Sequence, residues 1–187
     1  KSKVVILTTG TFLNGKIYFG NVSQEAGRIG NSSSKALAKF INKNFKTMRL
    51  KTGTPPRIYA KSINYDVLEP QTSENNGIFL SYFTKQNTNK KINCFITKTN
   101  NKTHKIIRNN LDKSAMYSGI IKSQGVRYCP SIEDKITKFG DRNGHNIFLE
   151  PEGLNSELVY PNGISNSLDK KIQLKFLRSI KGLEKCE

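Results

Sequence analysis

The sequence predicts a mixed α/β fold, and three observations support this expectation. A continuous apolar run rich in β-branched residues, Lys3–Thr9, is typical of a strand buried on both faces, as in a parallel sheet. Two segments, Ser32–Phe45 and Ser167–Ile180, carry apolar residues at helical spacing. Strand-like and helix-like segments alternate in mixed order, which leaves both an α/β and an α+β arrangement open.

The N-terminal elements follow from turn residues and capping residues. Asn14-Gly15 separates Lys3–Thr9 from a second strand-like run, Lys16–Val22, and this dipeptide favours a hairpin turn. The next expected element is the helix at Ser32–Phe45, with Leu37, Phe40 and Ile41 on one face. Arg49–Arg57 has turn chemistry throughout.

The remaining elements are expected at shorter intervals. Residues 64–91 are polar and irregular, so we expect a loop-rich stretch there. The expected later elements are a strand at 92–99, short helices at 103–111 and 131–139, a strand at 146–149, and the helix at 167–180 ended by Gly182.

Composition narrows the class of protein. The chain has 187 residues, with 31 Lys+Arg against 14 Asp+Glu, a net charge of +17. No run approaches the length of a transmembrane helix and no secretory signal opens the chain. Three cysteines without a CxxC pair argue against a disulfide framework. The excess of basic residues has two interpretations. It could form a surface that binds phosphate backbones, or it could reflect an AT-rich genome in which lysine accumulates at solvent-exposed positions.

Two further patterns limit the expected function. The chain opens with Lys1 and enters an apolar run at once, so we interpret it as a fragment of a longer protein. Gly10–Lys16 matches a phosphate-binding loop, but Ile17 stands where a hydroxyl is needed and the following residues favour a strand. No G-x-G-x-x-G occurs, so the chain has no complete dinucleotide-binding fingerprint.

The densest chemical segment is GVRYCPSIEDKITKF, Gly125–Phe139. Ser131 followed three residues later by Asp134 resembles a capping box, so a helix is expected to begin just after Cys129. A thiol beside Arg127 and near a helix N-terminus would have a lowered pKa, as in a nucleophile. The alternative is that Cys129 is a small buried apolar residue.

Other polar groups are less specific. His104 stands where a strand meets a helix, so it could contact a ligand or make a helix-end hydrogen bond. Glu150 and Glu152 flank Pro151 at the end of an expected strand. They could act as an acid or a base, or they could be solvated turn residues. Arg49, Lys51 and Arg57 surround a Gly-Thr-Pro-Pro turn that would suit a phosphate. Neither histidine has metal-ligand spacing, so no metal site is expected.

Seven motifs in order resemble one family. They are TTGTFLNGKI (8–17), GR-x-G (27–30), RLKTGTPPR (49–57), TN-x-x-TH (99–104), RYCPSIEDK (127–135), IFLEPEGL (147–154) and YPNGIS (160–165). Together they look like the GidA/MnmG family of flavin-dependent enzymes that modify tRNA uridine. The resemblance implies part of a flavin-binding, glutathione-reductase-like Rossmann domain in residues 1–55. It implies an inserted α/β region linked to NADH and substrate in 56–187. This chain would then be the middle of the family protein, incomplete at both ends.

The resemblance also implies an activity. Family members use FAD, NADH and methylene-tetrahydrofolate to install a carboxymethylaminomethyl or aminomethyl group on carbon 5 of the wobble uridine, U34. They work with an MnmE-type GTPase, as homodimers, in the bacterial cytoplasm or, if nuclear-encoded, in an organelle, and not at a membrane. The alternative is a non-catalytic basic tRNA- or RNA-binding module.

Site residues carry over by motif. Cys129 matches one of two functional cysteines and is the expected catalytic thiol. Thr9, Gly10, Thr11 and Ser34 match flavin contacts. The segment assigned to NAD comprises Gly125, Val126, Arg127, Tyr128, Cys129, Pro130, Ser131, Ile132, Glu133, Asp134, Lys135, Ile136, Thr137, Lys138 and Phe139. The candidates for tRNA or cofactor phosphate are Arg28, Lys51, Arg57, Arg108 and Arg127.

Overall fold

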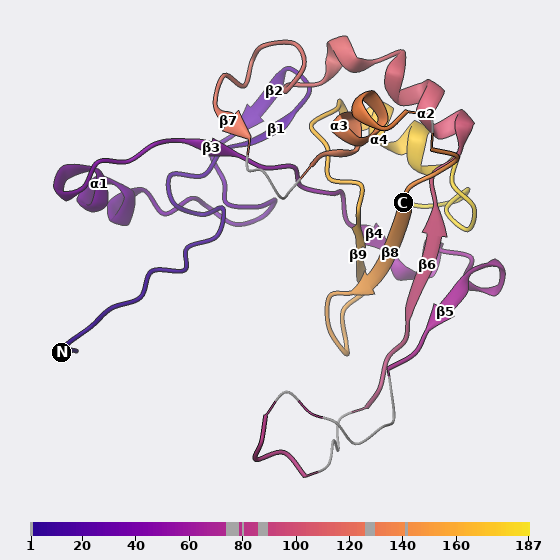
Figure 1. Ribbon diagram of the computed structural model, residues 1–187, viewed down its shortest axis with the longest axis horizontal. Coiled ribbons are helices and arrows are strands. Elements are labelled where there is room, and N and C mark those ends of the chain that lie inside the picture. Colours follow the sequence, from indigo (N-terminus) through magenta and orange to yellow (C-terminus); the bar gives the residue numbers. More distant parts are fainter. Residues whose placement is uncertain (1, 74–78, 80, 86–89, 126–129, 141) are drawn as a thin grey trace.

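A five-stranded antiparallel sheet is the largest sheet of the computed structural model, which describes residues 2–73, 79, 81–85, 90–125, 130–140 and 142–187. The strand order is β4-β9-β8-β6-β5 (Figure 1). The strands are β4 (Ile58–Tyr59), β5 (Glu69–Gln71), β6 (Cys94–Lys98), β8 (Asn146–Pro151) and β9 (Leu158–Asn162). In the register of the central strands, Ile96 lies opposite Phe148, and Leu149 lies opposite Pro161.

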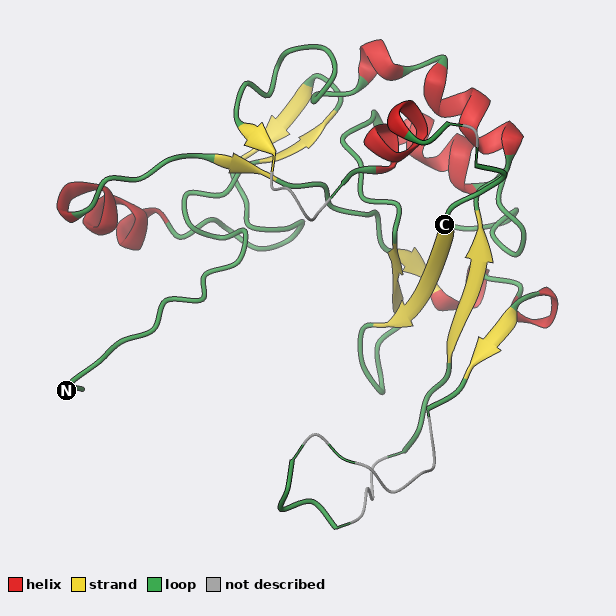
Figure 2. Cartoon of the chain, in the orientation of Figure 1, coloured by secondary structure: helices red, strands yellow, loops and turns green. Residues whose placement is uncertain are grey.

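Three helices close the core against this sheet. They are α2 (Asn101–Arg108), α3 (Ile132–Lys138) and α4 (Lys170–Leu177), and they gather at one end of the sheet (Figure 2). Alternate residues of β8, Ile147 and Leu149, are buried in one cluster with residues of all three helices. The helical members of this cluster are Ile107, Ile132, Ile136, Phe176 and Leu177.

The expected C-terminal helix is confirmed, and its boundaries have local causes. Asp169 caps α4 by accepting a hydrogen bond from the backbone N–H of Lys171. The predicted apolar face is buried: Leu168, Phe176, Leu177 and Ile180 lie in the core and Ile172 packs against it. The helix ends at Leu177 with Arg178 as its C-cap, before the predicted end at Ile180. Gly182, which was expected to end the helix, lies in a later turn with φ +82°.

Other expected elements are also confirmed, each with shifted ends. The strand at 92–99 is β6, the helix at 103–111 is α2, that at 131–139 is α3, and the strand at 146–149 is β8. Helix α1 (Lys35–Asn44) forms within Ser32–Phe45, but only Ala38 and Ile41 of it are buried, while Leu37 and Phe40 are exposed. The loop-rich stretch contains the 3₁₀ turn Tyr65–Val67 and β5.

The hairpin prediction at Asn14-Gly15 was wrong. The hairpin pairs β1 (Ile17–Phe19) with β2 (Val22–Gln24), and its turn is Gly20-Asn21, where Gly20 has φ +57°. Asn14-Gly15 instead ends a tight turn in which the Gly15 N–H donates to the carbonyl of Phe12. Asn-Gly suits several tight turns, so the dipeptide located a turn but did not fix the strands that flank it.

The expected strand at Lys3–Thr9 is absent from the structure. These residues have no helix or strand, and the four side chains from Val4 to Leu7 are 55–83% exposed. Figure 1 shows this segment, in indigo, running away from the rest of the chain. A strand forms only where a neighbour takes up its backbone hydrogen bonds, and no described strand of this chain lies beside it.

One short parallel pair joins distant parts of the sequence. Strand β3 (Leu50–Lys51) pairs with β7 (Gln124–Gly125), so Lys51 lies opposite Gly125. The RLKTGTPPR motif is thereby tied to the start of the GVRYCPSIEDK segment.

Candidate functional site

A cavity of about 600 Å³ lies where several segments of the chain meet. Its walls come from β1, the turn at Arg28, residues 54–59, the start of β9, helix α4 and the last two residues of the chain. The lining is largely apolar, with Phe19, Ile58, Tyr59, Leu158 and Leu174 among its residues. Three cationic side chains, Arg28, Arg57 and Lys170, line the same space. An apolar pocket with a few charged groups is the usual form of a small-ligand site.

Close packing fixes the Thr54–Arg57 wall of the cavity. The backbone N–H of Asn166 donates to the Thr54 carbonyl at 3.2 Å, so this turn lies directly against the segment before α4. A Cβ at Gly53 would lie 2.6 Å from the Cβ of Ser165, so the close approach requires glycine. The hairpin is held at its tip, because the Gly20 N–H donates to the Ser167 carbonyl at 2.9 Å.

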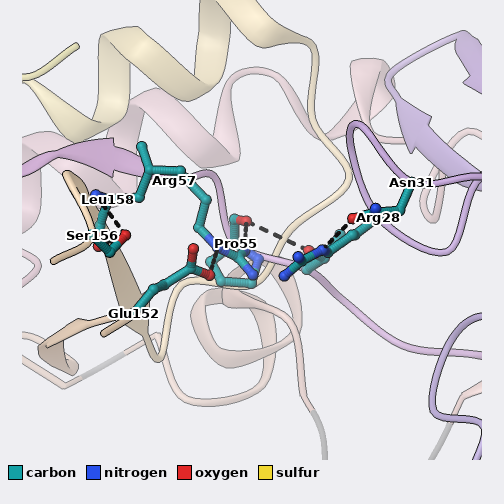
Figure 3. Close-up of polar contacts among 8 residues, drawn as sticks. Arg28, Asn31, Pro55, Arg57, Glu152, Ser156 and Leu158 are labelled. Atoms are coloured by element: carbon teal, nitrogen blue, oxygen red, sulfur yellow. Dashed lines mark hydrogen bonds and ion pairs between the residues drawn. The ribbon is translucent and has the colours of Figure 1, made fainter. Parts of the chain in front are cut away.

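Arg57 is held by three partners. Its Nε pairs with Oε1 of Glu152, one of its terminal nitrogens donates to the Pro55 carbonyl at 3.1 Å, and its guanidinium lies 4.5 Å from the ring centroid of Tyr160 (Figure 3). The Glu152 carboxylate neutralises much of the arginine charge, while the stacking and the carbonyl fix its plane. Glu152 is therefore an ion-pair partner of Arg57 and not a solvated turn residue.

Arg28 presents a different arrangement. Its Nε donates to the side-chain amide oxygen of Asn31 at 2.6 Å, and the Asn31 N–H donates back to the Arg28 carbonyl (Figure 3). Within the described part of the chain no carboxylate pairs with Arg28. The tight turn from Gly27 to Asn31 therefore carries a positive charge that an anion could neutralise.

The predicted phosphate contacts do not all come together. The structure brings Arg28 and Arg57 to one cavity, whereas Lys51 lies in β3 and does not line it. Arg108, at the end of α2, donates to the carbonyl of Gly140 and lies outside the cavity as well. Arg127 lies outside the described residues.

The four predicted flavin contacts are close in space. The Ser34 N–H donates to the Phe12 carbonyl at 2.8 Å, and the Phe12 N–H donates to the Thr9 carbonyl. Gly10 has φ +53° with open space where a Cβ would stand. Ser34 precedes α1 without capping it through its side chain, and a second hollow of about 650 Å³ lies there. Ser34 lines this hollow together with the Glu25 carboxylate, whereas Thr9, Gly10 and Thr11 do not line it, so the flavin assignment of the four residues stays a prediction.

The GVRYCPSIEDK segment is anchored in the core by its helix. Ser131 caps α3 as expected, since its hydroxyl accepts from the Asp134 N–H at 3.2 Å. Ile132 and Ile136 are fully buried, and Tyr117 donates to Asp134 from outside. Val126, Arg127, Tyr128 and the expected catalytic Cys129 lie outside the described residues, so their roles stay predictions.

Sequence reasoning missed a buried carboxylate in this helix. Glu133 is fully buried, and its Oε1 accepts hydrogen bonds from the Ser114 hydroxyl at 3.0 Å and the Ser167 N–H at 2.9 Å. Its Oε2 has no partner among the described residues. The carboxylate joins α3 to the segment leading into α4, and nothing in the spacing of these three residues predicts this.

The two histidines form a buried pair. The Nε2 of His104 hydrogen-bonds Oγ1 of Thr99 at 2.8 Å, and the His145 N–H donates to the same oxygen at 2.8 Å. Burial, and then nearby cations, lowers the pKa of both imidazoles. Of the two interpretations of His104, the structure supports the local hydrogen bond.

The remaining candidate groups do not form a reactive site. Burial raises the pKa of the Cys94 and Cys186 thiols, which argues against either as a nucleophile. Ile17 begins β1, so no helix follows Gly10–Lys16 and the phosphate-loop interpretation fails as expected. Within the described residues, no three His, Cys, Asp or Glu side chains are placed to hold a metal ion, and no helix is long and apolar enough to cross a membrane.

Fold and cavity together define a mixed α/β chain with a cationic site suited to an anionic ligand. The family described as Glucose inhibited division protein A matches residues 1–187. The MnmG protein of Thermodesulfovibrio yellowstonii, a tRNA uridine 5-carboxymethylaminomethyl modification enzyme, is 54% identical over 187 residues, which is 100% of this chain and 30% of that protein. The chain belongs to the GidA family.

Solved structures agree with this assignment. GidA of Aquifex aeolicus in its form I crystal is 45% identical with a TM-score of 0.81, over 96% of this chain and 31% of that one. The form II crystal gives 41% identity and a TM-score of 0.78, over 96% of this chain and 29% of that one. The expected mixed α/β fold and the family resemblance are confirmed. The chain spans about a third of the length of these relatives.

Proposed function

We propose that this chain serves as the central segment of an FAD-dependent enzyme that modifies carbon 5 of the wobble uridine of tRNA. The observation that carries the proposal is the 54% identity over all 187 residues to a tRNA uridine 5-carboxymethylaminomethyl modification enzyme. The product would be an aminomethyl or carboxymethylaminomethyl uridine. NADH and methylene-tetrahydrofolate would be the reductant and the carbon donor, and ammonium or glycine would supply the amino nitrogen.

Cys129 is the proposed catalytic thiol. Carbon 5 of uracil is a poor nucleophile, but addition of a thiolate to carbon 6 gives an enolate that attacks an electrophilic methylene through carbon 5. Loss of the carbon 5 proton and of the thiolate then restores the uracil ring. The sequence spacing supports this role, because Cys129 comes two residues before Ser131, the cap of α3, and a thiol near a helix N-terminus has a lowered pKa.

The cofactor and RNA contacts divide along the sequence. Residues 1–55 would hold FAD through Thr9, Gly10, Thr11 and Ser34, and 56–187 would contribute the NADH segment Gly125–Phe139. FAD would supply the redox chemistry when bound. Arg28 and Arg57 would contact phosphate at the cavity, and Lys51, Arg108 and Arg127 would do so elsewhere. We further propose a homodimer with an MnmE-type GTPase partner in the cytoplasm.

A different class, a non-catalytic basic RNA-binding module, is favoured by one observation, the net charge of +17. A module of this kind would bind tRNA with affinity that falls steeply as salt rises, because binding releases counterions. It would show no change in the RNA product.

The experiment that separates the two is Cys129→Ser in the full-length protein that contains this chain. The proposed function predicts loss of the modified uridine, measured by mass spectrometry of digested tRNA, with tRNA affinity unchanged. Cys94→Ser is the matched control, because the pKa of that thiol is raised by burial, and it should keep activity. Unchanged modification in Cys129→Ser would contradict the catalytic role.

A further inference from the structure

We infer that the cavity between β1 and α4 binds one unpaired nucleotide of an RNA chain, with Lys170 and Arg28 on its phosphate. This inference rests on the proposed function for its choice of RNA. It assigns Lys170 and Phe19, neither of which any sequence motif singled out.

The unpaired charge in the cavity is positive. Of its three cationic residues, Arg57 is already paired with Glu152, while Arg28 and Lys170 have no carboxylate partner in the described part of the chain. One further carboxylate, Glu187, also lines the cavity, so two free cations face one free anion. A monoanionic ligand group such as a phosphate diester would restore neutrality.

Lys170 reaches the cavity from the start of α4. It is the first residue of the helix and follows Asp169, whose side chain accepts a hydrogen bond from the Lys171 N–H. Its Nζ lies 4.7 Å from the ring centroid of Phe19, across the gap between α4 and β1. The ammonium group therefore lines the cavity beside an aromatic ring, where a phosphate and a stacked base could both reach it.

The walls suit a flat, half-apolar group. Tyr18, Phe19 and Tyr59 supply aromatic surface and Pro55, Ile58 and Leu158 supply aliphatic surface. Every nucleobase has a π-face that stacks on such side chains without sequence preference. A volume of about 600 Å³ accommodates one nucleotide and excludes a stacked duplex. An unpaired nucleotide, with a planar base and one adjacent phosphate, therefore matches both halves of the lining.

The test compares Lys170→Ala with Lys171→Ala in the full-length protein. The two lysines are neighbours and carry the same charge, but only Lys170 lines the cavity. The probes are a fluorescent RNA hairpin with an unpaired seven-nucleotide loop and a blunt RNA duplex of the same length. Binding is measured by anisotropy over a range of salt concentrations.

We expect Lys170→Ala to weaken binding of the hairpin about five- to tenfold and to reduce its salt slope by about 1, while Lys171→Ala changes it less than about twofold. Binding of the duplex should change equally in the two variants. Lys170→Arg should restore most of the hairpin affinity, which a purely structural loss would not allow.

Three results would overturn the inference: equal effects of the two alanine variants, an equal loss for hairpin and duplex, or displacement of the hairpin from the wild-type protein by NADH alone. The last result would assign the cavity to a free dinucleotide. Modification of tRNA by the wild-type protein, measured in parallel, separates this inference from the proposed function. If the wild type modifies tRNA but Lys170→Ala and Lys171→Ala bind the hairpin equally well, only the inference is refuted. If Lys170→Ala selectively loses hairpin binding but the wild type does not modify tRNA, only the proposed function is refuted.

Discussion

Arg57 and Glu152 lie 95 residues apart in the sequence, yet Nε of the arginine and Oε1 of the carboxylate are 2.5 Å apart. The pair joins the Thr54–Arg57 turn to the connection between β8 and β9, and the ring of Tyr160 supports the guanidinium. About a quarter of each side chain is exposed, 27% for Arg57 and 24% for Glu152. The contact therefore fixes one wall of the cavity in a partly desolvated setting.

This ion pair should be measurably coupled. A double-mutant cycle with Arg57→Ala and Glu152→Ala is expected to give a coupling energy of about 0.5–1 kcal/mol in urea unfolding, because partial burial limits screening by solvent. The matched control is the cycle for Lys35 and Glu25, whose side chains are 60% and 64% exposed and whose coupling should be too small to measure. Equal coupling in the two cycles would contradict the structural role given to Arg57.

The histidine pair predicts acid sensitivity. Burial holds the pKa of His104 and of His145 below the usual value, with Arg108, Lys135 and Arg142 adding positive charge around them. The unfolded chain binds these protons more readily, so stability is complete above about pH 6.5 and falls as the pH drops below it. Thermal unfolding between about pH 5 and pH 8 should show this slope. The variant His104→Gln/His145→Gln should flatten it, and an unchanged slope would contradict the assignment.

The cap of α3 should contribute to stability. Ser131→Ala removes the hydroxyl that accepts from the Asp134 N–H, and we expect a loss of about 1 kcal/mol in the free energy of unfolding. Ser34→Ala is the control, since Ser34 precedes α1 without a side-chain cap and should cost far less. If both variants lose the same stability, the cap does not explain where α3 begins.

Gly27 should not tolerate a side chain. A Cβ there would lie 2.1 Å from Cδ1 of Phe12, so Gly27→Ala is expected to destabilise the chain by about 1–3 kcal/mol and to displace the turn that carries Arg28. Gly153→Ala is the control, because its nearest neighbour would be 4.0 Å away. Chemical denaturation of the two variants gives the comparison, and a neutral Gly27→Ala would show that the turn can adjust freely.

The sequence predicted the elements whose signals are local. The helices within 167–180 and 131–139 and the strand within 92–99 were correct, because apolar spacing and caps act over a few residues. The strand expected at Lys3–Thr9 did not form, because its apolar pattern requires neighbouring strands and none of the described strands lies beside it. Strand β9 was missed, since its Pro161 and polar ends hide the alternation that pairs it with β8.

The candidate site was only partly predictable, because some of its residues are brought together by contacts between distant parts of the sequence. Arg28 and Arg57 came from motifs, whereas Lys170 and Phe19 meet where the Gly20 N–H holds the hairpin against the Ser167 carbonyl. The buried Glu133 also depends on contacts with Ser114 and Ser167, each far from it in sequence. Tertiary contacts of this kind leave no pattern in a single sequence.

The most direct test of the central claim is a chimera. Residues 1–187 would replace the matching segment of the Thermodesulfovibrio yellowstonii MnmG protein, to which they are 54% identical. The purified chimera, loaded with FAD, would be assayed for modified uridine in tRNA by mass spectrometry, with the Cys129→Ser chimera as control. The account predicts modified uridine from the chimera and none from the control. A folded, flavin-bound chimera that binds tRNA but leaves its uridine unmodified would contradict it.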